Sequence, residues 1–187
     1  MINTFTPRKP KRLKTHDYLQ QGYYHITICT HNHQEAFGTI KNNSMILNEY
    51  GHIANNTWID LPNHHKNIKL DEYIIMPNHI HAIINVVVGA GPARPFTKYK
   101  NSNNMSIIIG SYKSSVTRQI NKLNNNKFRW QRSFHDYIIR SSNHSLYNIR
   151  KYIINNPANW DADENNIKNY KLKGRAGPAP TATFDKI

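Results

Sequence analysis

Residues Tyr73 to Val88, YIIMPNHIHAIINVVV, contain two apolar runs that are separated by Met76-Pro77-Asn78. Side chains alternate between the two faces of a strand. A strand that begins at His79 therefore places His79 and His81 on one face and turns the residue between them toward the core. Two neutral imidazoles on one face provide half of a site for a divalent metal. We interpret the stretch as two strands joined by a turn or bulge, with the histidine pair at the start of the second strand.

The rest of the chain mixes strand and helix patterns within a single domain. Strands are predicted from β-branched and aromatic runs, and helices from apolar residues at three- and four-residue spacing. Asn48 is a candidate N-cap for the first helix. The predicted strands are 23–30, 37–40, 45–47, 68–76, 79–88 and 134–140, and the predicted helices are 48–61, 105–123 and 143–156.

The chain is strongly basic, with 25 Lys and Arg residues against 11 Asp and Glu residues and a formal net charge of +14. Such an excess favours a polyanionic partner, most often nucleic acid. The alternative is a basic surface with no such partner. Cys29 is the single cysteine, which excludes an internal disulfide and favours a reducing compartment. Without a membrane-length apolar run or a signal-peptide pattern, we expect a cytoplasmic protein.

The last predicted helix carries a second pair of candidate site residues. Tyr152 and Asn156 are four positions apart, so they share one face of the helix, away from its apolar stripe. The amide oxygen of Asn156 can complete a metal site begun by His79 and His81. The alternative is that Tyr152 is a packing residue and that Asn156 only ends the helix before a proline.

These residue types suit the transesterification of a phosphodiester. A divalent metal polarises a phosphate oxygen and orients the scissile bond, while a tyrosine hydroxyl attacks phosphorus and forms a covalent phosphotyrosine. A free phenol has a pKa of about 10, so the site has to assist the loss of its proton. Tyr147 and Tyr137 are the alternative nucleophiles.

Four segments make the sequence resemble a known family: RLKTHDYLQQGYYHITICTH, LDEYIIMPNHIHAII, WQRSFHDYIIR and IRKYIINNPANW. From about Arg12 to Trp160, the chain resembles the single-tyrosine HUH transposases, and among them the REP-associated tyrosine transposases. The resemblance implies an α+β, ferredoxin-like antiparallel sheet packed with helices. It also implies metal ligation by His79, His81 and Asn156.

The same resemblance implies that Tyr152 is the nucleophile and that Mg²⁺ or Mn²⁺ is the cofactor. The expected substrate is single-stranded DNA, often in hairpins, which is cleaved and rejoined through a 5′-phosphotyrosine. A Gly/Pro-rich insert, residues 89–95, departs from the family pattern. The rival functions are a domesticated binder of structured repeat DNA that does not cleave, and a module that binds single-stranded RNA.

The expected organisation is a basic arm at 1–21, the transposase domain at 22–160 and a polar, flexible tail at 161–187. We expect no membrane partner, and a bacterial protein that associates with the nucleoid as a monomer or a homodimer. Candidate phosphate contacts are Lys11, Arg12, Lys113, Arg118, Arg129 and Arg132. If these residues bind DNA, the affinity should fall steeply as salt rises.

Overall fold

The protein folds around an antiparallel sheet of four strands in the order β4-β5-β1-β6, beside a two-stranded hairpin, β2-β3. In the computed structural model, the described residues are 21–87, 105–123, 127–139 and 143–172. The strands are β1 (Gly22–Cys29), β2 (Gly38–Lys41), β3 (Ser44–Leu47), β4 (Ile68–Ile75), β5 (His79–Val86) and β6 (His135–Ile139). The helices are α1 (Glu49–Ile59), α2 (Leu61–His64), α3 (Met105–Leu123), α4 (Asn143–Asn155) and α5 (Ile167–Leu172), and short 3-10 turns occupy His31–His33 and Trp160–Ala162.

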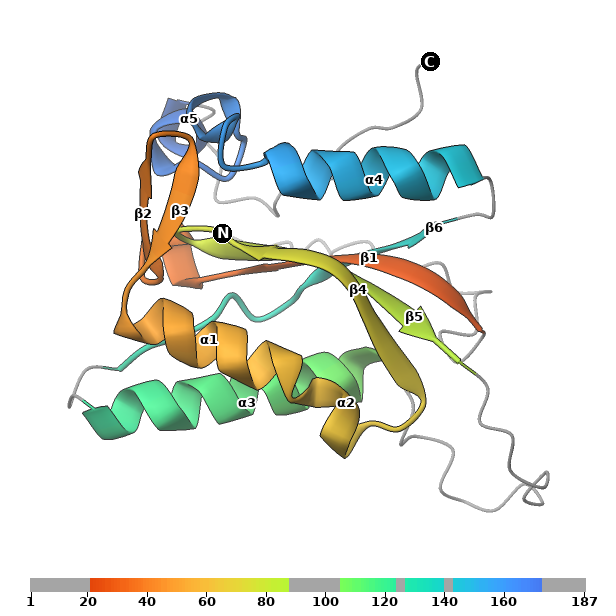
Figure 1. Cartoon of the computed structure of the whole chain (residues 1–187). Coiled ribbons are helices and arrows are strands. Elements are labelled where there is room, and N and C mark those ends of the chain that lie inside the picture. Colours follow the sequence, from red (N-terminus) through yellow and green to blue (C-terminus); the bar gives the residue numbers. More distant parts are fainter. Residues whose placement is uncertain (1–20, 88–104, 124–126, 140–142, 173–187) are drawn as a thin grey trace, which may run out of the picture.

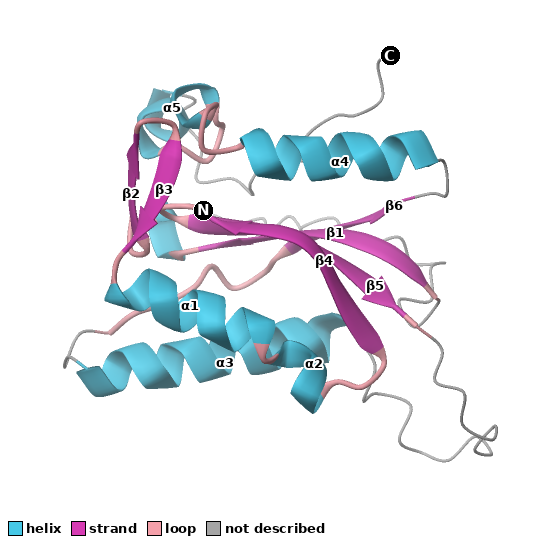
Figure 2. Ribbon diagram, in the orientation of Figure 1, coloured by secondary structure: helices cyan, strands magenta, loops and turns pink. Residues whose placement is uncertain are grey.

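The chain order β1, α1, β4, β5, α3, β6 gives the ferredoxin-like arrangement, with β1 and β5 as the central strands. Helices α1 and α3 lie on one side of the sheet and α4 lies on the other (Figure 1). Figure 2 shows the same layers, with helices on both sides of the strands. The expected α+β class, with an antiparallel sheet packed with helices, is confirmed.

The alternation of side chains in the central strands fills the core beneath α1 and α3. Full burial of an aliphatic side chain contributes about 1.5–3 kcal/mol, so this layer supplies much of the stability. From β1 and β5 it contains Tyr24, Ile26, Ile28, Ile80, Ala82 and Ile84, none of them more than 1% exposed.

The opposite face of the sheet is apolar at one end and polar at the other. Under α4, Ile83 and Ile139 pack with Ile149 and Ile153 in a second buried cluster. By the same alternation, His79 and His81 of β5 share this face with His25 and Thr27 of β1, because Thr27 pairs directly with His81. Helix α4, which carries Tyr152 and is called the tyrosine helix below, thus packs on the isoleucines of this face and extends over its histidines.

The first helix begins where the sequence predicted it. Asn48 is its N-cap, and the side-chain oxygen of Asn48 accepts a hydrogen bond from the Gly51 backbone at 2.9 Å. Gly51 lies against the hairpin, where a Cβ atom would come within 2.1 Å of the Phe37 carbonyl oxygen. The glycine is therefore required by this close approach. The predicted hairpin at 37–47 and the predicted helix at 105–123 are also present.

The C-terminal part differs from the expected flexible tail. Residues 161–172 form part of a 3-10 turn and the helix α5, and Asn165 and Asn166 are buried at 3% and 1% exposure. The physical reason is that Asn165 accepts hydrogen bonds from Asn78 and Cys29 of the domain, as described below. Residues 161–172 therefore extend the ordered part of the chain beyond residue 160, where the domain was expected to end. The rest of the predicted tail, 173–187, the arm at 1–20 and the insert at 89–95 lie outside the described residues.

Among the residues that the structure describes, no helix is both long enough and apolar enough to cross a membrane.

Candidate functional site: a histidine pair beside a tyrosine helix

His79 opens β5 directly after the turn that joins it to β4, and Asn78 in that turn fixes its protonation. The side-chain nitrogen of Asn78 donates to the carbonyls of His33, at 3.0 Å, and Asn165, at 2.7 Å. The other amide atom, Oδ1, therefore faces His79 Nδ1 at 2.8 Å. An amide oxygen can only accept, so Nδ1 carries the proton and Nε2 of the neutral ring carries a lone pair.

Burial keeps the His79 ring neutral. Complete burial lowers the pKa of His79 from 6.5 to about 4, against the opposing effect of the negative charge of Asp163. A neutral imidazole with a free lone pair is the form that binds a metal. His79 Nε2 is buried and has no hydrogen-bond partner among the described residues.

His81 lies two residues further along β5, on the same face. Its Nδ1 is 3.0 Å from Thr27 Oγ1 on the neighbouring strand, and its Nε2 is 3.1 Å from the hydroxyl of Tyr152. Burial, and then the charges of His79 and His25, lower the pKa of His81 well below 6.5. Both predicted histidine ligands are thus neutral and adjacent, with ring centroids 4.6 Å apart.

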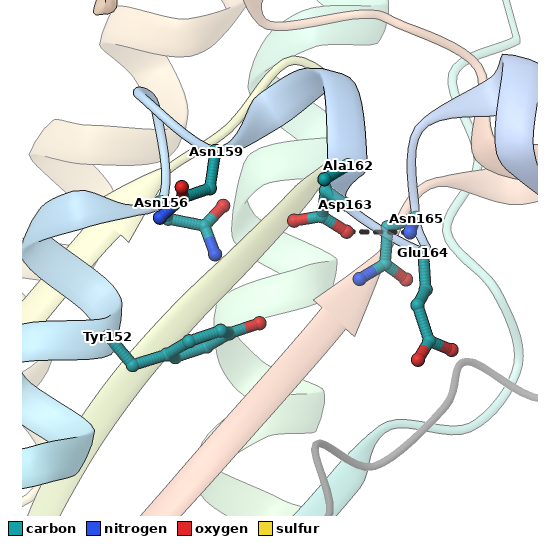
Figure 3. A pocket seen from close by; sticks show the side chains of 7 residues that line it. All are labelled: Tyr152, Asn156, Asn159, Ala162, Asp163, Glu164 and Asn165. Atoms are coloured by element: carbon teal, nitrogen blue, oxygen red, sulfur yellow. Dashed lines mark hydrogen bonds between the residues drawn. The ribbon is translucent and has the colours of Figure 1, made fainter.

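Tyr152 and Asn156 lie at the end of α4 and in the turn that follows it (Figure 3). Burial raises the pKa of Tyr152 above its usual value; the charge of Asp163 raises it further, and a hydrogen bond from the Asn156 side chain opposes this increase. Only the amide nitrogen can donate this bond. Asn156 Oδ1 consequently has a different direction, and it is buried without a hydrogen-bond partner in the described part of the chain.

These contacts define one consistent set of hydrogen bonds. In the arrangement that leaves a lone pair on His81 Nε2, the Tyr152 oxygen accepts from Asn156 and the Tyr152 hydroxyl donates to His81 Nε2. His81 Nδ1 in turn carries a proton that Thr27 accepts. Both histidines therefore present the Nε2 lone pair toward the same space, beside Tyr152. Hydrogen bonds at the second ring nitrogen commonly orient metal-binding histidines in this way.

His25 extends the histidine row onto β1. Its ring stacks on His81 with centroids 5.3 Å apart and meets the edge of Tyr152 at 6.2 Å. Burial lowers the pKa of His25 from 6.5 to about 4. The row is therefore uncharged at neutral pH, although it lies in a strongly basic chain.

Asp163 is a candidate residue that sequence reasoning missed. Its Oδ2 atom is 3.7 Å from His79 Nε2, a separation too long for a hydrogen bond, and its side chain is 4% exposed. The available signal was the run Asp161, Asp163 and Glu164, three of only 11 acidic residues in the chain. That run follows Trp160, where the domain was expected to end, so it was assigned to the tail.

The donor atoms fit a divalent metal. One ligand atom each from His79, His81 and Asp163 lie within 4.8 Å of one another. Ligands on one ion with bonds of about 2.1 Å are separated by roughly 3–4 Å, so small shifts would bring these atoms to bonding distance. His79 Nε2, Asn156 Oδ1 and Asp163 Oδ2 are all buried without hydrogen-bond partners among the described residues. Buried polar atoms are seldom left unsatisfied, and a cation would satisfy both His79 Nε2 and Asp163 Oδ2.

A pocket of about 280 Å³ opens beside these atoms. Figure 3 shows Asn156 and Asp163 on opposite sides of it, with the Tyr152 hydroxyl directed toward the space between them. The lining residues are Tyr152, Asn156, Asn159, Ala162, Asp163, Glu164 and Asn165. The pocket gives Tyr152 access to a ligand from outside the domain.

The other predicted residues lie away from this cluster or outside the described chain. Lys113 is half-buried, and its ammonium donates to the carbonyls of Gln131 and Arg132. Part of its role is therefore to hold that segment to α3. Arg118, Arg129 and Arg132 are exposed, whereas Lys11 and Arg12 are not among the described residues. The alternative nucleophiles Tyr147 and Tyr137 are 60% and 44% exposed.

The chain is 32% identical over 166 residues to an uncharacterized protein of Haemophilus influenzae, covering 84% of this chain and 92% of that protein. The chain belongs to the same family as that protein. No family model matches the sequence.

Among solved structures, a REP-associated tyrosine transposase bound to a REP hairpin matches with a TM-score of 0.53 and 16% identity, covering 80% of this chain and 74% of that one. The protein therefore has the fold of that transposase. A candidate transposase from Deinococcus radiodurans R1 also aligns, with a TM-score of 0.44, 16% identity, and coverage of 78% of this chain and 97% of that one.

Proposed function

We propose that the protein is a metal-dependent transposase-type endonuclease that cleaves and rejoins single-stranded DNA with Tyr152 as its nucleophile. The observation that carries the proposal is the position of the Tyr152 hydroxyl, 3.1 Å from Nε2 of His81 and beside unsatisfied buried acceptors. A tyrosine that served only for packing would need neither neighbour. The fold shared with a hairpin-bound transposase supports single-stranded hairpin DNA as the substrate class.

The proposed reaction is a transesterification at phosphorus. The Tyr152 oxygen forms a bond to phosphorus and loses its proton, while the bond from phosphorus to the 3′ oxygen breaks and that oxygen gains a proton. The products are a 5′-phosphotyrosine and a free 3′-hydroxyl. The number of phosphoester bonds is conserved, so the strand can be rejoined to another 3′-hydroxyl without an external energy source.

The chain's own residues prepare Tyr152 for this role. Burial disfavours the phenolate, and the Asn156 amide offsets part of that effect by donating to the phenol oxygen. His79, His81 and Asn156 would hold a Mg²⁺ or Mn²⁺ ion, which would supply positive charge for the phenolate and the phosphate. The isoleucines of α4 fix the tyrosine over the sheet, because Ile149 and Ile153 are buried on Ile83 and Ile139.

The test is a covalent-adduct assay with the full chain. Hairpin oligonucleotides from the DNA that flanks the gene are incubated with protein and Mn²⁺ or Mg²⁺, and a denaturation-resistant band is measured. We expect a band that a chelator removes and that is lost in Tyr152→Phe. Tyr147→Phe is the matched control, since Tyr147 is exposed on the same helix.

Other outcomes assign other functions. A band that persists in Tyr152→Phe and disappears in Tyr147→Phe or Tyr137→Phe would move the nucleophile to that residue. Tight hairpin binding without any band, at every metal concentration, would contradict cleavage and favour the non-cleaving binder of repeat DNA.

A further inference from the structure

Asp163 lies in the segment that follows the tyrosine helix, here called the post-helix segment (residues 157–172). We propose that Asp163 is a ligand of the divalent ion at the His79–His81 pair, and that this ion fastens the post-helix segment to the sheet. The inference rests on the metal site of the proposed function. It adds a carboxylate ligand from the post-helix segment, which is separate from β5 and α4.

Two acceptor atoms face each other at this position. Because Asn78 fixes the proton of His79 on Nδ1, the atom that His79 turns toward Asp163 is a lone-pair nitrogen. The facing atom is a carboxylate oxygen, Oδ2, 3.7 Å away. Two buried acceptors at this distance repel each other unless a cation lies between them. Their approach is therefore explained by an ion that both atoms bind.

The other oxygen of Asp163 is held by the protein. Its Oδ1 accepts the backbone N–H of Asn165 at 2.6 Å, the bond drawn as a dashed line in Figure 3. Asn165 is anchored in turn, since its carbonyl accepts from Asn78 and its side-chain oxygen accepts from the Cys29 thiol at 3.7 Å. One carboxylate oxygen thus positions the side chain, and the second one is left to bind the ion.

Asn78 links the two ligands. Its oxygen sets the tautomer of His79, and its nitrogen holds the Asn165 carbonyl, two residues from Asp163. Asn78 therefore positions both proposed ligands, His79 directly and Asp163 through Asn165. Outer partners of this kind are what orients metal ligands in proteins.

The ligand set has a consequence for the metal. Two imidazole nitrogens and one carboxylate, with the amide oxygen of Asn156 nearby, suit Mn²⁺ and later divalent transition metals. Mg²⁺ prefers oxygen ligands and retains several waters. We expect Mn²⁺ to bind the full-length protein at least tenfold more tightly than Mg²⁺.

The test is calorimetric titration of the DNA-free, full-length protein with Mn²⁺ alone. Asp163→Asn preserves the acceptor for the Asn165 N–H and removes the charge, and we expect it to weaken Mn²⁺ binding at least tenfold. Asp161→Asn is the matched control, because Asp161 is exposed in the same segment, and its affinity should stay within twofold of the unchanged protein. Equal Mn²⁺ affinity in Asp163→Asn and the unchanged protein would overturn the inference.

A thermal-melting series tests whether Asp163 binds the metal or only stabilises the fold. Without metal, Asp163→Asn should melt at a higher temperature than the unchanged protein, since it removes a buried charge that has no counter-ion there. With Mn²⁺, the melting temperature of the unchanged protein should rise, while that of Asp163→Asn should rise less. A variant that melts lower without metal, and gains the full Mn²⁺ shift, would make Asp163 structural and contradict the proposal.

These outcomes are independent of DNA cleavage. If His79→Ala abolishes Mn²⁺ binding and Asp163→Asn does not, the role of Asp163 fails alone and the proposed function stands. If Mn²⁺ binding depends on Asp163 but no covalent adduct forms, the inference stands and the proposed cleavage fails.

Discussion

The hydroxyl of Tyr152 and Nε2 of His81 are 3.1 Å apart and share a single lone pair, the one on the imidazole. A metal bound at His81 needs that same lone pair. Metal binding and the Tyr152–His81 hydrogen bond therefore exclude each other. In the metal-free protein His81 holds the Tyr152 hydroxyl, and a metal bound at His81 would release it.

Tyr152→Phe should consequently bind Mn²⁺ more tightly than the unchanged protein. The competing hydrogen bond is worth about 1 kcal/mol, so the dissociation constant should fall roughly fivefold. Calorimetric titration measures this dissociation constant, with Tyr147→Phe as the control. Weaker binding in Tyr152→Phe would mean that the phenol assists the metal instead of competing with it.

A second prediction concerns the ion pair between the tyrosine helix and the edge strand. Arg150 of α4 donates through Nε, at 2.7 Å, and through Nη2 to the two carboxylate oxygens of Asp71. Asp71 lies where β4 has an irregular register against β5, between Leu70 and Tyr73. The hydrogen bond from Arg150 lowers the pKa of Asp71. This paired contact joins α4 to the edge strand β4.

Arg150→Met should slow adduct formation more than it destabilises the fold. The side chain of Arg150 is 41% exposed, so the free energy of unfolding should fall by less than about 1 kcal/mol. The single-turnover rate should fall several-fold because the direction of Tyr152 loosens, while Mn²⁺ affinity stays unchanged. Lys151→Met is the control, since Lys151 is exposed on the same helix. Equal rates in the two variants would remove any positioning role from the ion pair.

The third prediction is a loss of stability in mild acid. His25 and His79 have pKa values of about 4 in the folded chain, against 6.5 for an unperturbed histidine. Below pH 6.5 these two histidines bind protons in the unfolded chain but not in the folded chain. The free energy of unfolding therefore decreases as the pH falls to about 4. Each of the two histidines should contribute a loss of about 3 kcal/mol.

Urea unfolding of the metal-free protein between pH 7 and pH 4 measures this loss. In His25→Leu the decrease should be smaller by about 3 kcal/mol, because one titrating group has been removed. His52→Gln, at an exposed position of α1, is the matched control. A pH-independent stability would contradict the neutral, buried histidine row.

The elements whose sequence pattern depends only on neighbouring residues could be predicted from the sequence. The alternation after Pro77 located β5, and the spacing of Ile149 and Ile153 located α4, because both periodicities follow from backbone geometry. The turn residues of the β2-β3 hairpin and the Asn48 cap are equally local. The structure places His79, His81, Tyr152 and Asn156 together, as the sequence suggested, while their chemical roles stay predictions.

The parts that could not be predicted depend on contacts between distant segments. Asn78 reads as a turn residue, and nothing near it in sequence reveals that its amide reaches carbonyls 45 and 87 residues away. Asp163 follows a helix-ending proline in a polar stretch, which is the usual composition of a loose tail. Its burial depends on Asn165, and so on the fold itself.

The placement of the histidine pair at the start of β5 leaves the far end of that strand independent of the site. Val86 is seven residues from His79, about 23 Å at the rise of a strand, and residues 88–104 follow there. Changes in the length of the chain after β5 can accumulate without displacing the histidine pair. The same position suits a fluorescent label or a fused affinity handle, attached at a point remote from the histidine pair.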